Sequence, residues 1–304
     1  MDTTLFRQRL YTHFVYLNRF QRITDVYQAV ARALGMAACV GELQRLRVYE
    51  SDRREADAFL ATEGMADEPR PLVIVNPNAG ELCLERRWPM ASFVGLVEEM
   101  TKASRLWLIL VGSAEEAEYT RGLYLELSPA ARRSVRVAAG KLSLGGFLAL
   151  LTRADLVISN DSGPFHLAQA MGVKTVSLWG PGTPLSYGPS RGDHVVVRTN
   201  IYCSPCLYLT DRPPCRGDNL CMKAIPVSGV LGAVERLQRR GEPGGSPIEI
   251  VIDLNHANFG DAVYRPWVIA IRSGYSPAAS KGLMAIENEP VKRQPWGTGD
   301  APRA

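Results

Sequence analysis

The chain contains no run of about 20 apolar residues, the length that a helix needs to cross a bilayer, so we expect no membrane span. The first residues interleave charged and aromatic side chains and lack the uninterrupted apolar core of a secretion signal. With 304 residues, of which 46% are hydrophobic, the chain has the composition of an ordinary globular protein of one large domain or two small ones. We therefore expect a cytoplasmic protein.

Long runs of one charge sign are also missing. The formal net charge is only +4, and Lys and Arg are scattered among acidic residues, which argues against nucleic acid as a partner. This charge supports no more than a mild attraction to phosphorylated ligands or to an anionic membrane surface. Peripheral association with the cytoplasmic face of a membrane is therefore the only membrane contact that we expect.

Cysteine is sparse except in one segment. Four of the six cysteines follow the pattern C-x2-C-x8-C-x5-C, and they are Cys203, Cys206, Cys215 and Cys221. In a reducing compartment this spacing favours metal ligation over a disulfide framework. The loop between the second and third cysteine is shorter than in most zinc ribbons, so a structural zinc ion and free, locally packed thiols both remain open.

From residue 70 onward, strand-like and helix-like stretches alternate. We expect strands at residues 71–75, 106–111, 135–138, 155–158, 174–178 and 195–197, with helices that include residues 89–102, 147–151 and 227–239. The strands are short and nearly all apolar, as expected for a parallel sheet that is buried on both faces. The pattern predicts an α/β fold with a doubly wound, Rossmann-like parallel sheet over residues 68–240.

Polar or glycine-containing turns follow several of these strands. They lie at residues 76–80, 112–116, 140–143, 160–166 and 180–183. Because the carboxyl ends of parallel strands share one edge of the sheet, these turns are expected to converge on one nucleotide-sized pocket.

The turn at residues 160–166 reads Asn160-Asp161-Ser162-Gly163-Pro164-Phe165-His166 and leads directly into a helix. The first N–H groups of a helix have no partner within it, and the helix dipole makes that end partly positive, so a phosphate fits there. The alternative is that Asn160, Asp161 and Ser162 only cap the helix.

This turn, continued through Leu178-Trp179-Gly180-Pro181 and Tyr187-Gly188-Pro189, resembles the signature of the lipopolysaccharide heptosyltransferases, glycosyltransferase family nine. Upstream, Asn76-Pro77-Asn78-Ala79-Gly80 and Arg86-Arg87-Trp88-Pro89 resemble further elements of that family, in the right order. Several matched elements are more specific than one motif.

The resemblance implies a GT-B glycosyltransferase, of which this chain would supply the C-terminal, donor-binding half. Such an enzyme transfers a sugar from a nucleotide diphosphate donor, typically ADP-heptose, with inversion and with no required metal or other cofactor. The implied acceptor is a lipopolysaccharide-like glycan or glycolipid.

By the same resemblance, Asp161 contacts the donor sugar, while the turn formed by Ser162, Gly163 and Pro164 meets the diphosphate. Pro164 has no N–H, so Ser162, Gly163 and Phe165 would donate to the phosphates. His166 would reach a phosphate oxygen, or else pack against Trp179 or a carbonyl group.

The remaining donor contacts implied by the resemblance lie in other turns. Arg86 or Arg87 would balance the diphosphate charge, and Asn78 lies in the first strand-turn. Glu115 would accept the ribose hydroxyls, or is simply an acid in the first turn of a helix. Leu142 would contact adenine, and Lys141 would reach a phosphate or only solvent.

The ends of the chain depart from the family pattern. We expect residues 1–67 to be a remnant of the N-terminal acceptor domain and the interdomain linker, with a helix at residues 26–34 and a polar, Arg-rich connection. The early acids Asp2, Asp25 and Asp52 lie in no glycine-rich strand-turn, so we name no catalytic base. Residues 241–304 are expected to form a linker and a tail, with one strand-like run at residues 248–254.

Three hypotheses follow. The first is a glycosyltransferase of the heptosyltransferase type, and the second is a nucleotide-sugar binding module that is catalytically incomplete. The third is a zinc-binding interaction protein centred on the four cysteines, which leaves the convergent turns unexplained.

Overall fold

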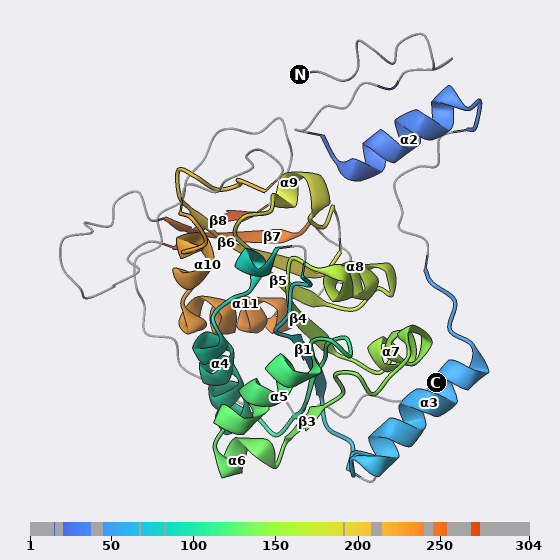
Figure 1. Cartoon of the computed structure of the whole chain (residues 1–304), viewed down its shortest axis with the longest axis vertical. Helices are drawn as coiled ribbons and strands as arrows, with labels where there is room; N and C mark the ends of the chain where they lie inside the picture. Colours follow the sequence, from blue (N-terminus) through green and yellow to red (C-terminus); the bar gives the residue numbers. More distant parts are fainter. Residues whose placement is uncertain are drawn as a thin grey trace, which may run out of the picture.

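The computed structural model describes residues 15, 21–37, 45–66, 68–81, 83–190, 192–207, 215–239, 246–253 and 269–273. One eight-stranded sheet forms its centre, in the order β3-β2-β1-β4-β5-β6-β7-β8 (Figure 1). Strands β1 to β7 pair in parallel, and β8 is antiparallel to β7. The order of the first six strands is that of a doubly wound Rossmann sheet, which confirms the predicted fold class.

Four of the eight strands are buried along their whole length. The strands are β1 (Leu72–Asn76), β2 (Trp107–Leu110), β3 (Val135–Val137), β4 (Leu156–Asn160), β5 (Thr175–Trp179), β6 (His194–Asn200), β7 (Ile248–Asp253) and β8 (Ile269–Ser273). All residues of β1, β2, β4 and β5 are buried. Helices on both faces of a parallel sheet explain why these strands lack polar alternation.

Helices cover both faces of the sheet (Figure 1). The described helices are α2 (Ile23–Ala33), α3 (Glu50–Thr62), α4 (Met90–Ala103), α5 (Ala117–Glu126), α6 (Pro129–Arg132), α7 (Leu144–Leu151), α8 (Gly163–Ala170), α9 (Pro184–Tyr187), α10 (Leu220–Lys223) and α11 (Val227–Arg239), with a 3-10 turn, η1, at Leu84–Arg86. Helix α2 buries no residue and lies away from the sheet (Figure 1). No helix in the described ranges is long and apolar enough to cross a bilayer.

Successive residues of β1 point to opposite faces and join two separate hydrophobic clusters. Val73 and Val75 pack in the cluster that contains the buried faces of α4 and α11. Leu72 and Ile74 pack in the cluster that contains α3 and α7. Burial on both faces fixes the register of the central strands and therefore the positions of their carboxyl ends.

Helix α3 lies where the sequence predicted only a polar connection before residue 68, so that expectation was wrong. Its Ala56 and Phe59 are buried in the same cluster as α7. The Glu55 carboxylate also accepts hydrogen bonds from the backbone N–H (2.6 Å) and the hydroxyl (2.5 Å) of Ser143. Only two residues of α3 are buried, which is why its apolar periodicity is weak.

Strand β7 confirms the predicted strand-like run but not its assignment to a tail. It pairs in parallel with β6 from Val195↔Ile248 to Asn200↔Asp253, so the sheet continues past residue 240, where we expected the domain to end. The rest of the predicted tail, apart from β8, lies outside the described residues.

Candidate functional site

The order in which the chain adds strands to the sheet reverses between β1 and β4. The chain continues from β1 to β2 on one side and from β4 to β5 on the other, while β1 and β4 are neighbours with Asn76 opposite Ser159. Loops that leave two adjacent strands in opposite directions open a crevice at the carboxyl edge, where open α/β sheets bind ligands. Asn76 and Asn160 end these two strands and are both fully buried.

The two asparagines tie the loops together. The Asn76 side-chain amide donates to the Ser159 hydroxyl at 3.1 Å and to the Ser162 hydroxyl at 2.8 Å. The Asn160 amide donates to the carbonyl groups of Pro77 at 3.0 Å and Asn78 at 3.1 Å. Because each buried amide is hydrogen-bonded across the crevice to the end or loop of the other strand, the loops are held in a fixed relative position.

The start of α8 leaves donors unpaired. The Ser162 hydroxyl is engaged with Asn76 and does not cap the helix. The Phe165 N–H donates to the Ser162 carbonyl at 3.2 Å. It is therefore already paired, whereas we expected it to donate to a phosphate. Within the described part of the chain, the N–H groups of Ser162 and Gly163 donate to no acceptor. Gly163 is exposed, and a Cβ there would meet nothing within 4 Å.

Asp161 lies beside two basic side chains. Its Oδ2 is 3.8 Å from Nη1 of Arg86, and its Oδ1 is 4.0 Å from Nε2 of His166. Burial raises the pKa of Asp161 to about 6, and Arg86 opposes that shift. Burial lowers the pKa of His166, so the imidazole is neutral at pH 7. A carboxyl group with this pKa can accept or donate a hydrogen bond near neutral pH.

A glycine lets another strand-end loop approach Asp161. A Cβ at Gly182 would lie 2.2 Å from Oδ2 of Asp161 and 3.6 Å from the Trp179 ring, which is too close for any side chain at the carboxylate. Trp179 packs edge-on against Phe165 with ring centroids 5.7 Å apart, and Phe165 is 5.0 Å from the His166 ring. His166 thus packs on Phe165, and Phe165 in turn packs against Trp179.

The two arginines have different surroundings. Nη2 of Arg86 donates to the Ala79 carbonyl at 2.8 Å. Arg87 lies over the Tyr119 ring at 4.2 Å, with Nη2 4.0 Å from Oε1 of Glu116. The Nε atoms of both arginines are buried without a hydrogen-bond partner. Unpaired cationic donors beside a crevice fit an anionic ligand with several oxygen atoms.

The structure places the neighbour of Glu115, rather than Glu115 itself, at the crevice. Glu115 is fully exposed, and a hydrogen bond with Ser113 lowers its pKa. Glu116 is partly buried and accepts from the N–H groups of Gly80 and Ser113, both at 3.0 Å. It therefore joins the loop after β1 to the loop after β2.

Asn78, Lys141 and Leu142 complete the predicted set. The Asn78 amide donates to the Val111 carbonyl at 3.1 Å, and its buried Oδ1 has no partner. Lys141 Nζ is 2.7 Å from Oε1 of Glu63, just after α3, and Leu142 packs against the cluster that contains α3 and α7. Contacts thus link Asn78 to the β1 and β2 loops, and Lys141 and Leu142 to α3.

Sequence reasoning assigned no donor-site role to several residues of the site, although most of them lie in the turns that it singled out. They are Asn76, Asn160, Glu116, Tyr119 and Gly182. Each asparagine stands at the end of an apolar run. A polar residue at the end of a predicted buried strand is the sequence signal that could have found them. Nothing in the sequence distinguishes Glu116 from Glu115.

Residues of the four-cysteine segment contact the loop after β5. The N–H groups of Cys206 (3.0 Å) and Leu207 (2.9 Å) donate to the Pro181 carbonyl. A Cβ at Gly180 would lie 2.9 Å from Sγ of Cys221. Burial, with the other thiols of the segment nearby, raises the pKa of Cys221 to about 12.

All four of these cysteines lie within the described residues. Cys203, Cys206, Cys215 and Cys221 are all free, and the described residues contain no group of three His, Cys, Asp or Glu side chains placed to hold a metal ion. The structural zinc stays a prediction.

Two of the three early acids lie within the described residues. Asp52 caps α3, where its Oδ2 accepts from the Tyr49 N–H at 2.8 Å. Asp25 is exposed in the first turn of α2. Asp2 lies outside the described residues.

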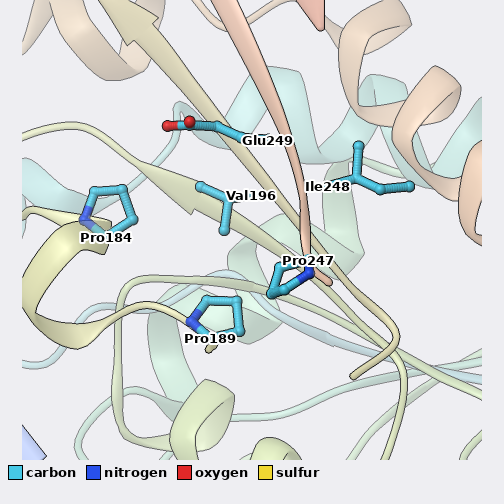
Figure 2. A pocket seen from close by; sticks show the side chains of 6 residues that line it. All are labelled: Pro184, Pro189, Val196, Pro247, Ile248 and Glu249. Atoms are coloured by element: carbon cyan, nitrogen blue, oxygen red, sulfur yellow. The ribbon is translucent and has the colours of Figure 1, made fainter. Parts of the chain in front are cut away.

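A small pocket lies apart from the predicted donor residues. It is lined by Pro184, Pro189, Val196, Pro247, Ile248 and Glu249 (Figure 2). Glu249 is the one charged residue of the six, and it is ion-paired with Arg198. The lining therefore offers no free charge for a phosphate.

Comparisons with known proteins find heptosyltransferases among the relatives of this chain. Lipopolysaccharide heptosyltransferase 1 of Pseudomonas aeruginosa is 33% identical over 133 residues, which cover 43% of this chain and 35% of that protein. Lipopolysaccharide heptosyltransferase 2 of Salmonella typhimurium is 26% identical, with coverage of 53% and 47%. The chain thus spans between about a third and a half of the length of these relatives.

A solved structure shares the fold. The family 9 glycosyl transferase of Veillonella parvula superposes with a TM-score of 0.63 at 24% identity, over 77% of this chain and 64% of that one. The sequence model of glycosyltransferase family 9 (heptosyltransferase) matches residues 9–215, which is more than half of the 304 residues and includes the crevice between β1 and β4. The chain belongs to glycosyltransferase family 9, the heptosyltransferase family.

Proposed function

We propose that the chain binds a nucleotide diphosphate sugar in the crevice between β1 and β4, as the donor half of a heptosyltransferase-type glycosyltransferase. The observation that carries this proposal is a set of unpaired donors around one carboxyl group. The N–H groups of Ser162 and Gly163 and the buried Nε of Arg86 lack partners in the described part of the chain, and Asp161 lies beside them. These groups suit a diphosphate attached to a sugar.

In this proposal the residues stabilise the departing diphosphate. The dipole of α8 and the charge of Arg86 act on the oxygens on which negative charge develops as the glycosidic bond to phosphate breaks. Asp161 faces the sugar and orients its hydroxyl groups. We infer transfer with inversion, with ADP-heptose as the donor and a lipopolysaccharide-like glycan or glycolipid as the acceptor, on the basis of family membership.

Acceptor activation is not assigned to a described residue. Asp52 is engaged at the start of α3, and Asp25 lies exposed on α2. A nucleotide-sugar binding module without catalysis of its own is therefore the second candidate. A zinc-dependent interaction protein is not favoured, because it leaves the crevice unexplained.

The net charge of +4 supports a weak attraction to an anionic surface. We include in the proposal that transfer takes place at the cytoplasmic face of the membrane, where a glycolipid acceptor is anchored.

Two measurements test the proposal. Calorimetry with ADP-heptose and with ADP tests donor binding, and Asp161→Ala is expected to weaken the binding of ADP-heptose more than that of ADP, because ADP lacks the sugar. Mass spectrometry of a glycolipid acceptor incubated with ADP-heptose then separates the two candidates, since an enzyme adds a heptose and a binding module does not. An equal effect of Asp161→Ala on both ligands would contradict the assignment of Asp161 to the sugar.

A further inference from the structure

Asn219 occupies the position before α10 but does not behave as a helix cap. Its backbone has φ 32° and ψ 45°, the left-handed conformation that asparagine, aspartate and glycine adopt most readily. An asparagine before a helix normally accepts a hydrogen bond from the first turn, yet the Asn219 side chain makes no such bond. Its amide is therefore directed to another part of the molecule.

That part is the turn that carries the two arginines. Nδ2 of Asn219 donates to the carbonyl of Glu85 at 3.1 Å and to the carbonyl of Arg87 at 3.2 Å. The two carbonyl groups flank Arg86. One amide group thus fixes the backbone on both sides of the side chain that reaches Asp161.

Asn219 is itself held by the core on the far side of α10. Met222 is fully buried, and the Thr199 hydroxyl donates to the Cys221 carbonyl at 2.9 Å. The next residue after the arginines, Trp88, is also fully buried, and its indole N–H donates to the Ile225 carbonyl at 2.9 Å. The arginine turn is thus anchored at one end by Trp88 and across its middle by Asn219.

We propose that Asn219 is a positioning residue that holds Arg86 in place over the crevice. The functional meaning of that placement rests on the proposed function, because Arg86 matters for donor binding only if a diphosphate binds there. Without the amide, the carbonyl groups of Glu85 and Arg87 lose this donor, and the turn keeps only its own backbone bonds and the bond from Arg86 to the Ala79 carbonyl. The Arg86 guanidinium is then held less firmly, and its charge is less well preorganised.

Two variants separate this role from general folding. Asn219→Gly keeps the left-handed backbone conformation and removes both hydrogen bonds. Asn219→Asp keeps the size and the backbone preference but places a carboxylate against two carbonyl groups. Lys223→Gln is the matched control, because it removes only an exposed ion pair with Asp218 in the same segment.

The first readout needs no ligand. NMR of the arginine Nε–H groups should show a single, dispersed Arg86 signal in the wild type and in Lys223→Gln, and a shifted or averaged signal in both Asn219 variants. An unchanged Arg86 signal in folded Asn219→Gly and Asn219→Asp would overturn the proposal.

The second readout is the affinity for ADP by calorimetry. Asn219→Gly should weaken binding by about 10-fold, the size expected for the loss of one or two hydrogen bonds, with little change in Tm. In an Arg86→Gln background the same substitution should change the affinity less than twofold if it acts through Arg86. A full 10-fold loss in that background would overturn the proposal. If the arginine signals move as expected but the wild type binds no ADP, the proposed function is wrong and the positioning of Arg86 by Asn219 stands.

Discussion

The Asp161 carboxylate lies 3.8 Å from the Arg86 guanidinium. Both side chains are largely buried, with 8% of Asp161 and 15% of Arg86 exposed. A close ion pair normally lowers the pKa of a carboxyl group, but here burial is the larger effect and raises it to about 6. Such a site is costly for the folded protein, as expected where groups are arranged for binding rather than for stability.

Asp161→Asn should stabilise the folded protein at neutral pH. Because the folded-state pKa is raised from 3.8 to about 6, the native state holds this proton more tightly, so stability is greatest below pH 4 and falls until the pH has passed 6. The shift corresponds to at most about 3 kcal/mol. Urea unfolding at pH 4 and pH 8 should show Asp161→Asn equal to the wild type at pH 4 and more stable at pH 8.

Asp218→Asn is the control for this measurement, because Asp218 forms an exposed ion pair with Lys223. It should follow the wild type at both pH values. An Asp161→Asn advantage of the same size at pH 4 and pH 8 would show that the effect does not come from ionisation of Asp161.

Glu116→Ala should destabilise the fold by about 1–3 kcal/mol, because two N–H groups, those of Gly80 and Ser113, lose their acceptor. Glu115→Ala should change the free energy of unfolding by less than about 0.5 kcal/mol, since Glu115 is exposed. Chemical denaturation of the two variants side by side makes the comparison. Equal effects would mean that the Glu116 hydrogen bonds do not join the two loops.

Gly182→Ala should weaken donor binding without a large loss of helical structure. The added Cβ would lie 2.2 Å from Oδ2 of Asp161, so either the carboxylate or the loop after β5 must move. Gly232→Ala in α11 is the matched control for added volume, because nothing lies within 4 Å of a Cβ there and Gly232 is not part of the proposed donor site. Calorimetry with ADP-heptose should show a loss of affinity for Gly182→Ala and no loss for Gly232→Ala.

The sheet could be predicted from the sequence because parallel strands buried on both faces are short apolar runs, and several of those here end at or just before a polar or glycine residue. Strand β4 and the start of α8 are the best example, because Asn160 to Gly163 mark both the end of the strand and the start of the helix. Helix α3 could not be predicted in this way, because only Ala56 and Phe59 are buried and most of its other residues are polar or charged.

Part of the candidate site could not be predicted from the sequence for a different reason. The choice between Glu115 and Glu116 depends on which side chain meets the N–H groups of Gly80 and Ser113, and the position of Gly80 is set by another strand. The contact of Asn219 with the arginine turn joins residues more than 130 positions apart. Neither contact leaves a periodic pattern in the sequence.

Calorimetric titration of ADP into the wild type, Arg86→Gln and Arg153→Gln tests the donor site most directly. Arg153 is the control, because it forms an ion pair with Asp57 in which both side chains are 52% exposed. We predict that the wild type and Arg153→Gln bind ADP equally well and that Arg86→Gln binds about 10-fold to 100-fold more weakly, as expected for the loss of charge-assisted hydrogen bonds. No binding by the wild type, or equal binding by all three proteins, would contradict the assignment of the crevice between β1 and β4 to a nucleotide diphosphate sugar.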